Sequence, residues 1–77
     1  MKVQVFAVLK DYFEKEFLLE DYVGNTKALK ESLLRLNPAA SGILEICRFA
    51  VNDEFIDDQY QFSLNDSIFI IPPASGG

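Results

Sequence analysis

Apolar and polar residues alternate along the start of the chain. Residues 2–9 are rich in β-branched and apolar side chains, and residues 16–20 form a second, shorter apolar run after a polar and aromatic connection at 11–15. Successive side chains of a strand point to opposite faces, so both runs predict strands, paired as a hairpin. The first strand has one fully apolar set, which is expected to face the core: Val3, Val5, Ala7 and Leu9.

The spacing of the apolar residues changes in the middle of the chain. Three leucines recur at i, i+4 and i+7, at positions 29, 33 and 36, and most charged residues lie on the other side. This period predicts one amphipathic helix from Thr26 to about Asn37, able to cover one face of a sheet. Thr26 or Asn25 is expected to cap its start, and Pro38 to end it.

Short apolar runs separated by turn residues fill the second half. The expected elements are a loop at 39–42, a helical turn at 43–46, a strand at 47–51, a turn at 52–54, a short strand at 55–56 and a last strand at 67–71. The polar stretch between the last two strands carries three alternating side chains that are expected to anchor it: Tyr60, Phe62 and Leu64. The last strand is apolar on both faces, as a central strand is.

These elements predict an α+β domain with one helix on a mixed sheet of four or five strands. The first and last strands are the most apolar, so we expect them side by side in the middle of the sheet. Residues 1–71 are predicted to form the domain, and residues 72–77 a flexible C-terminal tail.

Composition excludes several kinds of site. The 77 residues carry a net charge of −5, which argues against binding to nucleic acid. No histidine is present, and the single Cys47 has no second cysteine for a disulfide or a zinc pair, so no metal site and no self-sufficient enzyme are expected. We find no apolar run that could span a membrane and no signal-peptide pattern, which predicts a cytoplasmic protein.

The end of the chain carries the most specific pattern. Pro72 and Pro73 cannot donate to a sheet ladder and favour an extended exit from the last strand. The small residues Ala74, Ser75 and Gly76 follow, and Gly77 ends the chain. A stiff base with a tip that lacks side chains suits a backbone that threads a narrow channel, and the functional group at the tip is the α-carboxylate of Gly77.

Together with the order of elements, this Pro-Pro-x-x-Gly-Gly ending resembles the sulfur-carrier subunits of molybdopterin synthase, which are MoaD-type proteins of the ubiquitin-like β-grasp fold. The resemblance covers nearly the whole chain. It is strongest in four stretches: residues 2–7, the helix from Thr26, residues 50–52 and residues 64–77. Thiamine-pathway (ThiS) carriers share the fold and the terminal glycines but usually lack the two prolines.

The resemblance implies a reaction cycle centred on Gly77. An E1-like activating enzyme would adenylate the carboxylate with ATP and magnesium, and a sulfur donor protein would displace AMP to leave a thiocarboxylate. The carrier would then dock on the large subunit of molybdopterin synthase and deliver sulfur to cyclic pyranopterin monophosphate. The carrier would hold no permanent cofactor and would not be catalytic alone, and two carriers would flank a large-subunit dimer in a heterotetramer.

The resemblance also implies a contact surface for these partners. One helix covers only one side of the sheet, so apolar residues on the other side, including Phe6, Phe55 and one of Ile70 or Ile71, are expected to form an exposed patch. Phe6, Phe55 and Ile71 match the family's hydrophobic contact surface, and the tail residues 72–75 extend it toward the glycines. The competing interpretation is that some of these side chains are ordinary core residues.

Three other functions fit the same sequence. The chain could carry sulfur for the thiamine thiazole or for a tRNA base. It could be a ubiquitin-like modifier that is conjugated to protein lysines through Gly77, because conjugation uses the same adenylate. It could also be a passive interaction module, in which case deletion of Gly76 and Gly77 would leave its function intact.

Overall fold

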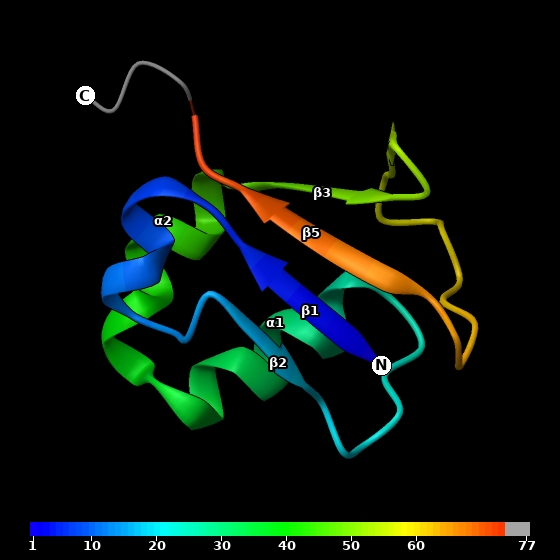
Figure 1. Ribbon diagram of the computed structural model, residues 1–77, viewed down its shortest axis with the longest axis horizontal. Coiled ribbons are helices and arrows are strands. Elements are labelled where there is room, and N and C mark those ends of the chain that lie inside the picture. Colours follow the sequence, from blue (N-terminus) through cyan, green and yellow to red (C-terminus); the bar gives the residue numbers. More distant parts are fainter. Residues whose placement is uncertain (74–77) are drawn as a thin grey trace.

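The computed structural model describes residues 1–73, which form a five-stranded sheet backed by helices (Figure 1). The elements in chain order are β1 (Lys2–Val5), the 3-10 helix η1 (Ala7–Asp11), β2 (Glu16–Leu18), α1 (Thr26–Leu36), the 3-10 helix η2 (Pro38–Ala40), α2 (Ser41–Ile46), β3 (Arg48–Val51), β4 (Glu54–Phe55) and β5 (Ser67–Ile71).

The sheet has the strand order β2-β1-β5-β3-β4. β1 and β5 pair in parallel, and the other neighbours pair antiparallel. The prediction that the first and last strands lie side by side is therefore confirmed, as is the first hairpin. A mixed sheet that wraps one main helix is the β-grasp architecture of the α+β class, as the resemblance implied.

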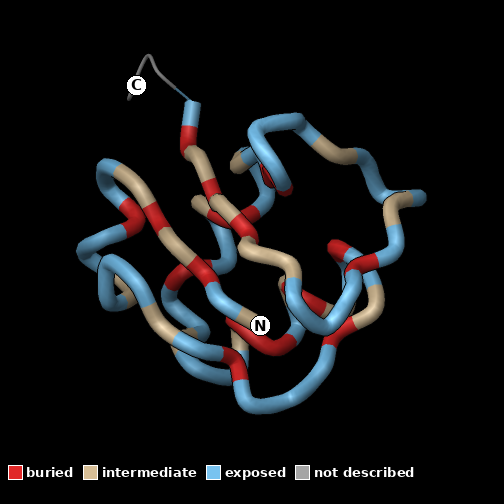
Figure 2. The backbone as a smooth tube through the Cα atoms, turned by 45° about the vertical axis from the view of Figure 1, so that its right-hand side comes forward, coloured by how far each residue is buried: buried red, intermediate tan, exposed pale blue. Residues whose placement is uncertain are grey.

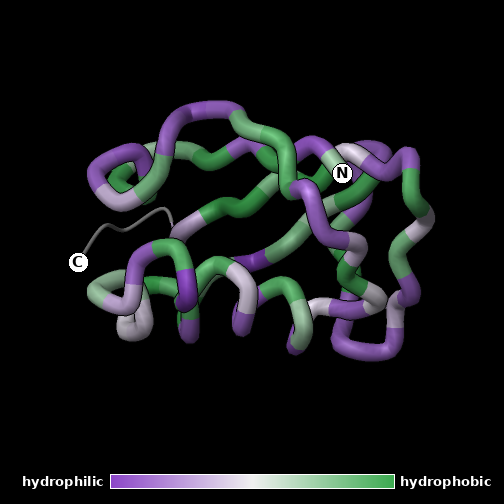
Figure 3. The backbone as a smooth tube through the Cα atoms, turned by 90° about the horizontal axis from the view of Figure 1, so that it is seen from below, coloured by the Kyte–Doolittle hydropathy of each residue, from purple (hydrophilic) through white to green (hydrophobic). Residues whose placement is uncertain are grey.

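The core lies between the sheet and α1. Alternate residues of the two central strands are completely buried, which Figure 2 shows as the alternation of red with paler segments along them: Val3, Val5, Ile68 and Ile70. Leu29 and Leu33 of α1 are buried in the same cluster. In Figure 3 the turns of the helix run along one side of the sheet, with hydrophilic residues on the outer side. The amphipathic pattern thus covers one face of the sheet only.

The first strand is shorter than its apolar pattern predicts. β1 ends at Val5, and Ala7 adopts a left-handed backbone conformation with φ of 52° that starts η1. The turn breaks the alternation, so the prediction that Ala7 faces the core is wrong: Ala7 is exposed. Leu9 is fully buried as expected, but it reaches the core from η1 rather than from a strand.

The start of α1 uses both predicted capping residues in different ways. Asn25 is the N-cap, and its side chain accepts a hydrogen bond from the backbone N–H of Ala28 at 2.9 Å. Thr26 is the first helical residue, and its hydroxyl donates to Asp58 at 2.8 Å, which ties the helix to the loop before β5. At the other end, Leu36 is 62% exposed, so its expected place on the core stripe is wrong.

The second half differs from the prediction in four places. Residues 39–42 are largely helical, because η2 and α2 follow one another directly, and Cys47 precedes β3 rather than beginning it. β4 covers residues 54–55, one residue earlier than expected. Asn52 and Asp53 both have positive φ, 54° and 66°, which is the tight two-residue turn that joins antiparallel strands. Leu64 is 69% exposed and anchors nothing, whereas Phe62 is buried.

Candidate functional site

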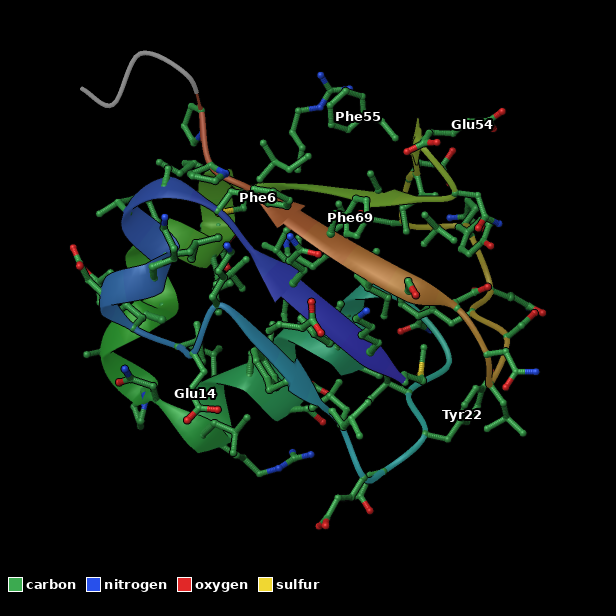
Figure 4. The ribbon with its side chains drawn as sticks, viewed as in Figure 1. Phe6, Glu14, Tyr22, Glu54, Phe55 and Phe69 are labelled. Atoms are coloured by element: carbon green, nitrogen blue, oxygen red, sulfur yellow. The ribbon has the colours of Figure 1, made fainter. Side chains whose placement is uncertain are left out.

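The face of the sheet opposite α1 is not covered by any element among residues 1–73, and it faces the viewer in Figures 1 and 4. The register places Gln4, Phe69 and Ala50 side by side in one row across the sheet, and Phe55 pairs with Ala50 at its end. We call the uncovered apolar surface the open face. Its members are Phe6, Ala50, Phe55, Phe69 and Ile71.

Two phenylalanines form the centre of the open face: Phe6, which directly follows β1, and Phe69 on β5. The rings of Phe6 and Phe69 meet edge to face, with centroids 5.8 Å apart and an interplanar angle of 82°. Figure 4 shows both side chains on the viewer's side of the sheet. Each is half-buried, so the pair keeps part of its apolar area available to another molecule.

Phe55 extends the open face along β4. Its side chain is 52% exposed, while Ala50, which lies between it and Phe69, is only 5% exposed. The guanidinium of Arg48 stacks on the Phe55 ring, with its central carbon 3.7 Å from the ring centroid. Arg48 therefore holds a fixed place over an exposed ring instead of extending freely into water.

The open face leads directly to Pro72 and Pro73, which we call the tail root. Ile71 ends β5 and lies opposite Arg48 in the register, half-buried on the open face, whereas Ile70 points to the core and is completely buried. Pro72 is buried and Pro73 is exposed, so the chain leaves the domain surface between the two prolines. The boundary of the domain after residue 71 stays a prediction. Four predicted site residues lie outside the described residues: Ala74, Ser75, Gly76 and Gly77.

Few charged side chains lie on the open face, and two of them pair with each other. Lys2 lies on it, but the Nζ atom is 3.3 Å from Glu16 Oε2 on β2, and the two charges compensate each other. Arg48 is the other cation that the strands place there. An apolar surface with polar residues at its rim is typical of protein–protein contacts.

The described residues offer little chemistry of their own. Residues 1–73 contain no group of three metal-ligating side chains that could hold a metal ion. The Cys47 thiol is half-buried and donates to the carbonyl of Ile43 at 3.1 Å. Burial raises its pKa, which the charge of Lys30 only partly opposes, so the thiol stays protonated and is a poor nucleophile. None of the helices described is long and apolar enough to cross a membrane.

The structure brings the predicted contact residues together. Phe6, Phe55 and Ile71 all lie on the open face, and the tail root adjoins them. Three residues on this side of the sheet were missed: Ala50, Phe69 and Arg48. Phe69 lies in the apolar run 68–71, so only the strand register shows which face it occupies. The place of Arg48 at the site became evident only from its contact with the Phe55 ring.

Comparison with known sequences gives relatives of similar length. The model of the ThiS family matches residues 3–77. A molybdopterin synthase sulfur carrier subunit of Dictyostelium discoideum is 35% identical over 81 residues, covering 99% of this chain and 94% of the relative. A protein of the same name from Chlamydomonas reinhardtii is 35% identical over 82 residues, covering 100% of this chain and 98% of the relative.

Solved structures show the same fold. SAMP1 of Haloferax volcanii superposes with a TM-score of 0.77 at 19% identity, covering 99% of this chain and 97% of the other, and this likeness supports the fold alone. A chain in the complex of subunits 1 and 2 of the molybdopterin-converting factor from Helicobacter pylori superposes with a TM-score of 0.70 at 27% identity. It covers 99% of this chain and 96% of that one.

Proposed function

Because the chain belongs to the ThiS family, we propose that it is the sulfur-carrier subunit of a molybdopterin synthase. The observation that carries the proposal is the 35% identity, over essentially the whole of both chains, to two proteins named as that subunit. The ending Pro-Pro-Ala-Ser-Gly-Gly supports it, because the resemblance to the sulfur-carrier subunits rests most strongly on this motif.

The chemistry of the proposal takes place at Gly77. A carboxylate oxygen attacks the α-phosphorus of ATP on an activating enzyme, with magnesium, and pyrophosphate leaves. A sulfur nucleophile then attacks the acyl carbon and expels AMP, which leaves a thiocarboxylate. This group is a soft nucleophile at neutral pH. Its sulfur attacks a carbon of cyclic pyranopterin monophosphate and displaces an oxygen substituent, and water then cleaves the acyl–sulfur bond, which returns the Gly77 carboxylate and leaves the sulfur on the pterin. The carrier supplies the sulfur, and the partners supply the catalytic groups.

The open face is the docking surface in this proposal. Phe6, Phe55 and Ile71 offer apolar area, Phe69 lies between them, and the surface continues into the tail root. A partner that covers this surface receives the tail at a fixed position relative to its own active site. The Helicobacter pylori structure contains both subunits of its factor, which supports a large-subunit partner here.

The test reconstitutes the cycle from purified proteins. The chain, with a free C-terminus, is incubated with its activating enzyme, ATP, magnesium and sulfide, and intact mass spectrometry reads whether sulfur has replaced one terminal oxygen. The loaded chain is then mixed with the large subunit and cyclic pyranopterin monophosphate. We expect molybdopterin to form, and Gly77→Ala to keep the fold while losing most of the transfer.

Two results would contradict the proposal. An unmodified C-terminus after incubation with the activating enzyme would remove the carrier role. A loaded chain that yields no molybdopterin, but appears linked to protein lysines in cells, would instead support the modifier function. Gly77→Ala variants with full transfer would show that no narrow channel reads the terminal residue.

A further inference from the structure

Within residues 1–73, the open face carries one cation that no carboxylate balances. Among residues 1–73, the ion pair within 4.0 Å joins Lys2 to Glu16, and Arg48 has no acidic partner. The chain as a whole is acidic, with twelve acidic and seven basic residues. The negative net charge of the chain therefore attracts a basic partner at long range. Close to Arg48, however, the electrostatic potential is positive and favours an acidic group.

The guanidinium is held in place before any partner arrives. It lies 3.7 Å from the Phe55 centroid, and Phe55 comes from β4, which the two-residue turn at 52–53 fixes against β3. A guanidinium stacked by one face on a ring keeps its N–H donors free at the edges. These donors match the two oxygens of a carboxylate, which is the geometry of the strongest charge-assisted hydrogen bonds.

Arg48 also occupies a particular position along the sheet. It lies directly opposite Ile71, the last strand residue before the tail root. A partner that covers Phe55 and Ile71 must therefore remove water from the guanidinium. An unpaired charge in such a contact costs free energy, so the covering surface has to supply an anion.

We propose that Arg48, clamped on Phe55, is a specificity-determining residue of the open face, and that the large subunit presents a carboxylate opposite it. This inference rests on the proposed function. The pair fixes the rotation of the carrier on its partner and therefore the line along which the tail leaves, because a single charge contact within an apolar surface rejects other registers.

The test measures the dissociation constant of the chain with the large subunit of the same organism by calorimetry, at low and high salt. Arg48→Met removes the charge and keeps the apolar stem. The matched control is Lys27→Met, which removes the same charge from the exposed surface of α1, on the other side of the sheet. We expect Arg48→Met to bind about tenfold or more weakly, and the control to stay within about twofold.

A second pair of variants tests the clamp itself. Phe55→Leu keeps apolar area but removes the ring that orients the guanidinium. We expect Arg48→Met to cost less in this background than in the wild type, so the two changes are not additive. Arg48→Lys keeps the charge without the planar fork and should recover only part of the affinity. Circular dichroism of each variant shows that the fold is intact.

The outcomes separate this inference from the proposed function. Wild-type binding with equal affinities for Arg48→Met and Lys27→Met would overturn the role of Arg48 and leave the docking proposal standing. Additive effects of Arg48→Met and Phe55→Leu would overturn the clamp. A wild-type chain that does not bind the large subunit would overturn both proposals.

Discussion

The two faces of the sheet are built from similar residues and behave differently. Ile70 and Ile71 are neighbours on β5, yet the first is completely buried against the helix side and the second is half-buried on the open face. Phe49 and Phe69 differ in the same way on adjacent strands. Apolar composition therefore does not separate the stability of the fold from partner binding; the position of the single main helix does.

The difference has an energetic meaning. Covering an apolar side chain with α1 gives stability to the isolated domain, at about 25 cal/mol for each Å² removed from water. The same area left uncovered on the open face gives nothing to the isolated chain and becomes available when a partner covers it. Substitutions on the covered face should consequently change the free energy of unfolding, and substitutions on the open face should change the affinity for the partner.

The largest expected effect is on the covered face. Ile70→Ala should lower the free energy of unfolding by about 2–5 kcal/mol, because it leaves a cavity beneath α1 where the side chain is fully buried. Ile71→Ala, the matched variant one residue away, should cost less than about 1.5 kcal/mol. Urea denaturation of both variants measures the difference.

Equal losses at these two positions would remove the distinction between the faces at the end of β5. A larger loss at Ile71 would show that it belongs to the core, and that Pro72, which is buried beside it in the sequence, closes that core.

The next effect is on the open face. Phe6→Asp should weaken binding to the large subunit by about thirtyfold or more, since it places a charge in the apolar centre of the contact. Its effect on stability should be near 1 kcal/mol, the value of its edge-to-face contact with Phe69. Calorimetry and urea denaturation give the two quantities.

Leu64→Asp is the control, because Leu64 is exposed but lies on the loop before β5 rather than on the open face. It should change neither quantity appreciably. A Phe6→Asp chain that fails to fold would mean that Phe6 is a core residue and that the patch is smaller than described.

The smallest effect concerns the turn that positions β4. Asp53 has φ of 66°, a conformation that glycine adopts freely and alanine does not. Asp53→Ala should lower the free energy of unfolding by about 1 kcal/mol, whereas Asp53→Gly should raise it by a fraction of that. Both variants remove the same carboxylate, so opposite signs in thermal unfolding isolate the backbone.

Losses of equal size in the two variants would show that the carboxylate, and not the left-handed backbone, matters at this turn. The position of Phe55 on the open face would then need a cause other than the tight turn between β3 and β4.

Most of the fold could be predicted from local patterns. The helical period of Leu29 and Leu33 and the capping residue Asn25 give α1 almost to the residue, and the apolar run at the chain's end gives β5. Ala7 shows where such patterns fail. The apolar residues Val8 and Leu9 follow it and extend the strand-like run in the sequence. The structure instead turns at Ala7 and buries Leu9 from η1, a tertiary contact that the local pattern does not indicate.

The site could be predicted in part. Phe6, Phe55 and Ile71 were found through the resemblance, and the register then placed them on one face. Phe69 could not be assigned, because every residue of 68–71 is apolar and alternation cannot choose a face for such a run. Arg48 depends on a contact between two strands, which only the folded chain shows.

The central place of β5 has a mechanical consequence. The strand is hydrogen-bonded to β1 on one side and to β3 on the other, and the tail root follows it without a break. A pull along the tail loads both ladders in shear, so that all their bonds resist together instead of peeling one by one. In the proposed sulfur-carrier function, a partner that pulls on the tail would therefore act against both ladders at once, which favours withdrawal of the domain with its sheet intact.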